Sequence, residues 1–322
     1  MSRFVLVTGG AGFIGSHLVD RLVLEGYRVR VVDNLSSGRL ENLERHRGSS
    51  SVEVVVGDLK DPGTALKAVE GVEAVFHFAA NPEVRVSTTN PEVHFSENVV
   101  ATFNLLEAMR RRGVRDLVFA SSSSVYGEPG HIPVGEEEPV RPVSVYGASK
   151  AACENLMHAY SRLYGIRAVS LRYANIVGPR LRHGVIWDLV NKLLANPREL
   201  EVLGDGTQTR SYLHVSEAVE ATLLAWRRAG EGFAVYNVGN EDWITVNDVV
   251  RIVLSEMGLE GVKLVYKPVA HGVGWPGDVK RIALRIDKLK KLGFSPSMNS
   301  TASVTATVRA LLEEIGRGTP HG

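Results

Sequence analysis

The chain has 322 residues, more than the roughly 100 to 200 residues of a typical domain, so its length predicts one large α/β unit with an appendage, or two domains. Lysine and arginine number 37 against 36 aspartates and glutamates, and a formal net charge of +1 excludes a global field for binding nucleic acid or an anionic membrane. A hydrophobic share of 44% and a charged share of 23% exclude disordered, collagen-like and coiled-coil chains. No apolar stretch is long enough to span a membrane, and the single cysteine, Cys153, excludes an internal disulfide and a cysteine metal site. We therefore expect a cytoplasmic protein without a bound metal.

Short apolar runs rich in valine alternate with helical patterns through the first half of the chain. The runs predict strands at 4–8, 28–32, 52–56, 74–79, 115–120 and 166–171. The segments between them predict helices at about 12–26, 61–70, 91–112 and 144–165. Because the runs are continuously apolar, we expect an α/β fold with a doubly wound parallel sheet that helices cover on both faces.

The pattern becomes less regular after residue 172, with turn signals at 178–179 and 204–206. This change predicts a smaller, interleaved C-terminal α/β domain. We expect the first domain to comprise 1–174 and about 209–240, and the second to comprise 175–208 and 241–315.

A glycine-rich turn connects the first strand to the first helix. Gly9 permits the tight turn, Gly12 lets the backbone approach a pyrophosphate, and Gly15 allows the helix to pack closely on the strand. The N-terminus of the helix then offers unpaired N–H groups to the anion. The second strand ends in Asp33, whose carboxylate can bind both hydroxyls of an adenosine ribose and would repel a 2′-phosphate. These features predict a Rossmann-type domain that binds NAD in preference to NADP.

Two further strand ends are expected beside the dinucleotide. Asp58 follows the third strand, where the adenine should lie, although by itself it is typical of a turn. Ala79 and Ala80 follow the fourth strand, and their small side chains would let a cofactor lie across its end.

A serine-rich strand end at 121–124 and a later helix start carry the candidate catalytic groups. Ser144 can cap the helix, and Tyr146 and Lys150 are four residues apart, so one helix face presents a phenol and an ammonium together. A phenol with its ordinary pKa of about 10 is a poor base at neutral pH. A nearby cation and a positive nicotinamide would stabilise the phenolate, and a serine hydroxyl from the strand end can hydrogen-bond the reacting sugar oxygen.

In combination these motifs resemble the extended short-chain dehydrogenase/reductase family, and within it the UDP-glucose (UDP-galactose) 4-epimerases. The resemblance covers essentially the whole chain. Its motifs are TGGAGFIG at 8–15, DNLSSG at 33–38, GDL at 57–59, HFAANPEVR at 77–85, SSSSVYG at 121–127, YGASK at 146–150, LRYANIVGP at 171–179 and GDGTQTRSYLHV at 204–215.

The resemblance implies a role for each residue that matches a family motif. The catalytic residues it implies are Ser122, Tyr146 and Lys150. The cofactor-binding residues it implies are Gly9, Gly12, Phe13, Ile14, Gly15, Asp33, Asn34, Ser36, Gly38, Asp58, Leu59, Phe78, Ala79, Ala80, Asn98, Tyr146, Lys150 and Tyr173. The substrate-binding residues it implies are Arg85, Ser122, Ser124, Tyr146, Asn175, Val185, Leu203, Arg210, Tyr212 and Asp278.

The activity implied is inversion of the sugar at C4 with NAD through a 4-keto sugar tethered by UDP. Tyr146 would remove the proton from O4, Ser122 would hold O4, and Lys150 would bind the nicotinamide ribose and depress the Tyr146 pKa. The family's homodimer, in which helices near 91–112 and 144–165 pair into a four-helix bundle, is also implied. Neither nucleic acid nor a membrane is expected as a partner.

The sequence departs from the family pattern ahead of Asp278, where relatives usually carry a second phosphate-binding arginine and residues 271–277 contain none. Arg85, Arg180 or Arg182 could replace it, or one guanidinium and backbone donors could hold the diphosphate. Arg210 could supply that guanidinium or could instead pair with Asp205. Asn175 could likewise bind the UDP part or simply satisfy a turn.

Related activities are separated by the residues after Ser122. Sugar-nucleotide 4,6-dehydratases carry an acid pair there, and the UDP-glucuronate decarboxylases a glutamate, whereas this chain has Ser123 and Ser124. A UDP-glucuronate or UDP-N-acetylhexosamine 4-epimerase and an NAD-dependent sugar-nucleotide oxidoreductase remain alternatives. A catalytically silent NAD-sensing protein is the alternative from another class, and retention of Ser122, Tyr146 and Lys150 argues against it.

Overall fold

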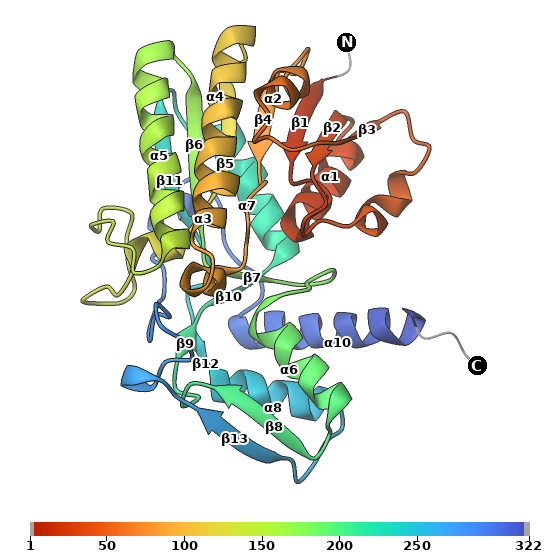
Figure 1. Cartoon of the computed structure of the whole chain (residues 1–322), viewed down its shortest axis with the longest axis vertical. Helices are drawn as coiled ribbons and strands as arrows, with labels where there is room; N and C mark the ends of the chain where they lie inside the picture. The colour runs from red at the N-terminus through yellow and green to blue at the C-terminus, as the bar shows by residue number, and fades with distance from the viewer. Residues whose placement is uncertain (1–2, 319–322) are drawn as a thin grey trace.

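A seven-stranded parallel sheet forms the centre of the computed structural model, which describes residues 3–318 (Figure 1). Its strands are β1 (Phe4–Thr8), β2 (Arg28–Asp33), β3 (Val52–Val56), β4 (Ala74–His77), β5 (Asp116–Ser122), β6 (Arg167–Tyr173) and β11 (Phe233–Val238). They lie in the order β11-β6-β5-β4-β1-β2-β3, and every neighbouring pair is parallel. The expected doubly wound sheet is therefore confirmed. Its strand order reverses between β1 and β4, and in such sheets a ligand crevice opens at the carboxyl ends of these strands.

Alternation of side chains along each strand divides the core into two layers. Val5, Val7 and Phe76 pack on the side of α1 (Phe13–Leu24) and α7 (Val215–Arg228). Leu6 and Val75 pack on the side of α2 (Pro62–Ala68), α4 (Ala101–Arg112) and α5 (Val145–Tyr164). Both faces of the central strands are thus covered, and this explains why their sequence runs are continuously apolar.

Two predicted elements differ from the structure near the strand ends. The strand predicted at 74–79 ends at His77, because the chain at Ala79 leaves the sheet and passes close to the Gly9 backbone. The helix predicted at 91–112 is α3 (Glu92–His94), a π-helical turn η3 (Phe95–Val100) and then α4. The π-helical turn contains Asn98, whose side chain bonds to two other segments of the chain.

Three two-stranded sheets build the C-terminal region below the central sheet in Figure 1. They are β7 (Asn175–Val177) with β10 (Tyr212–His214), β9 (Thr209–Arg210) with β12 (Ile244–Thr245), and β8 (Glu199–Leu203) with β13 (Lys263–Lys267). Around them pack α6 (Gly184–Ala195), α8 (Val246–Glu256) and α10 (Ser300–Gly318). The chain enters this region after β6 and returns to the central sheet at β11.

Short helices complete the described chain. They are η1 (Leu40–His46), η2 (Val84–Thr88), η4 (Ser123–Tyr126), η5 (Ala270–Gly272) and α9 (Asp287–Lys290). Across residues 3–318, no helix combines the length and the apolar character that a membrane crossing requires.

Helix α5 is anchored at both ends and in its middle. The Ser144 side chain caps its start by accepting from Gly147 N at 3.1 Å, and Gly165, at φ 68°, ends it. In the middle, Glu154 Oε2 accepts from Arg172 Nη2 at 2.7 Å, and its Oε1 accepts from Ser121 Oγ at 2.6 Å. Since these partners lie on β6 and β5, a buried charged network fixes α5 against the two strands.

Removing the Glu154 carboxylate should strongly destabilise the fold. We expect Glu154→Ala to lower the free energy of unfolding by about 3–5 kcal/mol, because the buried Arg172 guanidinium loses its ionic partner. Glu44→Ala is the control, since Glu44 pairs with Arg47 at the surface, where a pair contributes only about 0–1 kcal/mol. Urea unfolding of both variants measures the difference, and equal losses would contradict the assignment.

Candidate functional site

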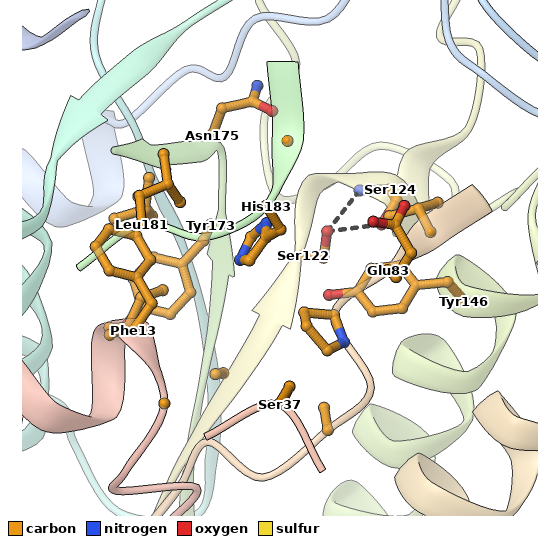
Figure 2. A pocket seen from close by; sticks show the side chains of 18 of the residues that line it. Phe13, Ser37, Glu83, Ser122, Ser124, Tyr146, Tyr173, Asn175, Leu181 and His183 are labelled. Atoms are coloured by element: carbon orange, nitrogen blue, oxygen red, sulfur yellow. Dashed lines mark hydrogen bonds between the residues drawn. The ribbon is translucent and has the colours of Figure 1, made fainter. Parts of the chain in front are cut away.

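A cavity of about 530 Å³ lies at the carboxyl ends of the central strands and extends to the C-terminal region. Figure 2 shows Phe13, Tyr173, Ser122 and Tyr146 around one space. From the loops of the central sheet it is lined by Gly9, Gly12, Phe13, Ile14, Gly15, Asp33, Asn34, Ser36, Asp58, Leu59, Phe78, Ala79, Ala80 and Arg85. Further lining residues are Ser122, Ser124, Tyr146, Lys150, Tyr173, Asn175, Val185, Leu203, Arg210, Tyr212 and Asp278. Every predicted site residue except Gly38 and Asn98 therefore lies at this cavity.

The glycine-rich turn forms a cradle that only glycine can build. A Cβ on Gly9 would lie 2.6 Å from Ala79 N, and one on Gly15 would lie 2.2 Å from Gly9 O. No side chain caps the N-terminus of α1, so its first N–H groups remain available to an anion at the cavity. The turn thus fits the pyrophosphate of a dinucleotide.

Asp33 has a structural role in addition to the predicted binding role. Its Oδ2 accepts from Ala11 N at 3.0 Å and its Oδ1 from Leu35 N at 2.9 Å. Burial raises the pKa of this carboxyl group, and the two backbone bonds oppose that rise. Gly38 does not line the cavity; a Cβ there would lie 2.6 Å from Asp33 Oδ1, so Gly38 is needed for the close packing of its own loop on Asp33.

Asn98 is the second predicted cofactor residue that does not line the cavity. Asn98 is only 2% exposed, because its side chain bridges two segments of the chain that line the cavity. Asn98 Oδ1 accepts from Asn81 N at 3.0 Å, and Nδ2 donates to Ser149 Oγ at 2.8 Å. Asn98 therefore acts as support for the cavity wall.

Tyr146 and Lys150 project from the first turns of α5 into the cavity wall. Lys150 Nζ donates to Ala120 O at 2.8 Å, lies 4.8 Å from the Phe119 ring centroid and 5.8 Å from that of Tyr146. Burial lowers the pKa of Lys150 to about 8. Burial also raises the pKa of Tyr146 to about 12, against which the Ser122 hydroxyl acts. The sequence predicted that Lys150 and a positive nicotinamide would depress the Tyr146 pKa, whereas in the protein alone desolvation raises it.

Ser122 ends β5 beside the Tyr146 phenol. Its Oγ lies 2.6 Å from Ser124 Oγ and accepts from Ser124 N at 3.2 Å, as the dashed lines of Figure 2 show. This pair holds the Ser122 hydroxyl at the strand end, where a substrate oxygen near Tyr146 can reach it.

Arg210 is held by Asp278 and not by Asp205. Arg210 Nη2 donates to Asp278 Oδ1 at 2.6 Å, whereas Asp205 accepts from Lys280 Nζ at 2.6 Å. The alternative pairing of Arg210 with Asp205 is therefore wrong. Asn175 Nδ2 donates to Ser211 O at 3.3 Å, so it satisfies the local backbone and also lines the cavity.

Each candidate for the missing second arginine is already paired. Arg180 donates to Asp20 at 2.8 Å, Arg182 to Glu314 at 2.6 Å and Arg85 to Glu83 at 3.2 Å. The N-terminus of α6, which has no side-chain cap, begins at the cavity and presents backbone donors. Because Arg210 is paired as well, these ion pairs do not choose among the four arginines, and the start of α6 adds backbone donors to whichever of them binds a diphosphate.

Sequence reasoning missed several residues that line the cavity, among them Glu83, His183 and Trp275. Glu83 lies inside the motif at 77–85, so the motif could have drawn attention to it. Nothing in the local sequence indicates that His183, directly before α6, lies at the same cavity. Within residues 3–318, no group of three or more His, Cys, Asp or Glu side chains is arranged to hold a metal ion.

Comparison with known proteins agrees with this geometry. Residues 5–239 match the model of the NAD dependent epimerase/dehydratase family. A UDP-glucose 4-epimerase of Mycolicibacterium smegmatis is 36% identical over 310 residues, which cover 94% of this chain and 96% of the relative.

Two solved structures share the whole fold. A crystal structure of a UDP-galactose 4-epimerase is 52% identical, with a TM-score of 0.87 and coverage of 97% of this chain and 99% of the other. A UDP-glucuronic acid 4-epimerase from Bacillus cereus, in complex with UDP-glucuronic acid and NAD, is 27% identical, with a TM-score of 0.88 and coverage of 97% and 99%. The glycine cradle and the neighbouring Tyr146 and Lys150 side chains agree with the family match, which covers most of the chain. The chain therefore belongs to the NAD dependent epimerase/dehydratase family.

Proposed function

We propose that this protein is a UDP-glucose/UDP-galactose 4-epimerase. The observation that carries the proposal is the convergence of Ser122, Tyr146 and Lys150 at one cavity, between the glycine cradle and a wall with Asn175 and Arg210. The identity of 52% with a UDP-galactose 4-epimerase over nearly the whole chain supports the choice of hexose.

The cofactor NAD fits the residues on one side of the cavity. Gly9, Gly12 and the start of α1 would hold its pyrophosphate, and Asp33 its adenosine ribose. When bound, NAD would supply a positive nicotinamide able to take up a hydride from the sugar C4 and return it. Because Asp33 would repel a 2′-phosphate, NADP is disfavoured.

The catalytic residues handle the proton of the sugar O4. Ser122 hydrogen-bonds O4, and the Tyr146 phenolate accepts its proton as the ketone forms. The neutral Tyr146 phenol that results can return this proton to the ketone oxygen when the sugar is reduced again. Lys150, held against Ala120 O, is placed to bind the nicotinamide ribose.

The UDP part is proposed to bind the C-terminal region, formed by 175–208 and 241–315. Arg210, kept in place by Asp278, would contact the diphosphate together with backbone N–H groups at Val185. Leu203 and Tyr212 would line the uridine slot, with Asn175 beside them. The remainder, 1–174 and about 209–240, forms the NAD-binding domain in this proposal. A sugar tethered in this way can turn its other face to the cofactor before reduction.

The protein is also proposed to be a cytoplasmic homodimer. Phe103 on α4 is 45% exposed and Leu163 on α5 is 71% exposed, although both helices pack their other faces on the sheet. Figure 1 shows α4 and α5 side by side at the edge of the molecule. A second copy would cover these apolar side chains in a four-helix bundle. The single cysteine, Cys153, is buried and free, in keeping with a reducing compartment.

Loss of the phenol tests the proposed chemistry. With UDP-galactose and NAD, the wild type should reach an equilibrium mixture containing UDP-glucose without net NADH, as followed by chromatography and NADH absorbance. Tyr146→Phe should lower this rate by about a hundredfold or more, since positioned acid–base catalysis contributes at least that much. Stoichiometric NADH with a released keto sugar would instead indicate an oxidoreductase, and no conversion would reject the hexose epimerase.

Replacement of the buried ammonium should separate stability from activity. Lys150→Met is expected to abolish epimerisation while raising the thermal midpoint by a few degrees at neutral pH, because the folded protein no longer buries a charge. The pKa of Lys150 is about 8 in the fold and 10.5 in the unfolded chain, so the unfolded chain binds more protons between these values. The wild type therefore gains stability as pH rises through this window. The difference in thermal midpoint between Lys150→Met and the wild type should shrink accordingly.

The difference in thermal midpoint between Lys150→Met and the wild type is measured at neutral pH and again above pH 10.5, the pKa of the lysine in the unfolded chain. Lys67→Met, at an exposed position on α2, is the control and should show no pH-dependent difference. An advantage of Lys150→Met that stays constant with pH would contradict the assignment.

A charge on the exposed face of α4 tests the dimer. Phe103→Asp should shift the mass measured by light scattering from two chains to one, because it buries an unpaired charge in the bundle. Leu24→Asp changes an apolar residue on α1 that is 81% exposed, and should leave the mass unchanged. A wild type that is monomeric at micromolar concentration would reject the dimer.

A further inference from the structure

Glu83 places a carboxylate at the catalytic end of the cavity. It lines the cavity with Ser122, Ser124 and Tyr146, and Figure 2 shows its side chain beside theirs. We propose that Glu83 determines the sugar specificity, by accepting hydrogen bonds from neutral hexoses and repelling uronic acids. The inference rests on the proposed function, and it decides between the hexose and the UDP-glucuronate alternatives.

The backbone holds Glu83 in a fixed relation to the catalytic tyrosine. Asn81 Oδ1 accepts from Glu83 N at 3.1 Å, and Asn81 is in turn bound through its own N to Asn98. After one turn of η2, Ser87 Oγ accepts from Tyr146 N at 3.1 Å. Glu83 and Tyr146 thus belong to one hydrogen-bonded frame.

Arg85 leaves half of the carboxylate unpaired. Arg85 N and Nε donate to Glu83 Oε1, at 3.4 and 3.2 Å. Glu83 Oε2 has no hydrogen-bond partner within residues 3–318. One oxygen is therefore available to a ligand.

The charge of Glu83 reaches both sides of the site. Burial lowers the pKa of His183, which lines the cavity, and the Glu83 charge opposes that shift. The ring of His94 lies edge-on to that of Tyr146, with the ring centroids 5.5 Å apart. Burial and the Lys150 charge lower the pKa of His94, and the Glu83 charge opposes this shift. The cation paired with Glu83 is Arg85, through Oε1, whereas Lys150 Nζ donates to Ala120 O.

The chemistry of the substrate places the distinguishing group near this carboxylate. The sugar O4 must contact Ser122 and Tyr146, and the carbon that carries the C6 group is bonded directly to C4. A neutral hexose presents hydroxyls that can donate to Glu83 Oε2, whereas a uronic acid presents a second carboxylate at C6. Because the ring shows both faces to the cofactor during epimerisation, the C6 group occupies two positions around C4. In either position, the C6 carboxylate of a uronic acid would lie near the partly buried carboxylate of Glu83, and the repulsion between the two charges disfavours binding.

The fold alone does not exclude uronic acids. The Bacillus cereus UDP-glucuronic acid 4-epimerase superposes on this chain with a TM-score of 0.88. Selection between the two substrate classes must therefore come from individual side chains, and Glu83 is the carboxylate that Figure 2 shows beside Ser122 and Tyr146.

Relative turnover of the two substrates tests the proposal. The kcat/KM values for UDP-galactose and UDP-glucuronate are measured for the wild type, Glu83→Gln and Glu83→Asp, together with the inhibition constant of UDP-glucuronate against UDP-galactose. Glu83→Gln keeps the shape without the charge, and we expect it to shift the ratio of the two kcat/KM values toward UDP-glucuronate by about tenfold or more. UDP-glucuronate should also become a tighter inhibitor by a similar factor. Glu83→Asp keeps the charge and should retain most of the wild-type ratio.

Glu92→Gln is the matched control, because it removes the same charge from an exposed position on α3 a few residues away. It should leave the ratio and the inhibition constant unchanged. The inference is overturned if Glu83→Gln changes neither quantity, or if the wild type uses both substrates equally well. In both cases UDP-galactose is still epimerised and the proposed function stands, whereas a wild type inactive on both sugars would overturn the proposed function itself.

Discussion

The buried pair between Glu154 and Arg172 is the interaction on which the site geometry depends. It joins the middle of α5 to β6, and the bond from Ser121 joins the same carboxylate to β5. Tyr146 and Lys150 stand on that helix, and Ser122 stands on that strand. Their mutual positions are therefore set by a buried charged network in which Ser121 lines the cavity and Glu154 and Arg172 lie behind it.

A second constraint acts at the cofactor side. The chain after β4 passes so close to the glycine-rich turn that a Cβ on Gly9 would lie 2.6 Å from Ala79 N. This contact shapes the cradle and also ends β4 two residues earlier than its apolar run. The close contact between Gly9 and Ala79 thus explains both the shape of the glycine cradle and the end of β4 at His77, before the predicted end at residue 79.

Of the buried groups that suit the chemistry, Lys150 is unfavourable for folding at neutral pH. Lys150 is 2% exposed and its ammonium has a lowered pKa, while the Tyr146 phenol has a raised one. Both shifts have burial as their main cause, so the protein alone disfavours the charged form of each group. Buried charges of this kind are retained at functional sites at a cost in stability.

The sequence by itself determined the parallel sheet, the glycine-rich turn, the position of Asp33 at a strand end and the spacing of Tyr146 and Lys150 on one helix face, because continuous apolar runs and short-range spacings are local properties of the chain; Ser122 was proposed from the family resemblance. It could not determine which residues contact one another over long separations. Only the tertiary structure decided that Arg210 pairs with Asp278, that Arg180 and Arg182 are committed to Asp20 and Glu314, and that Glu83 and His183 share one cavity. The physical reason is that a side chain's partner depends on how distant segments pack, whereas the local pattern records only whether each segment is a helix, a strand or a turn.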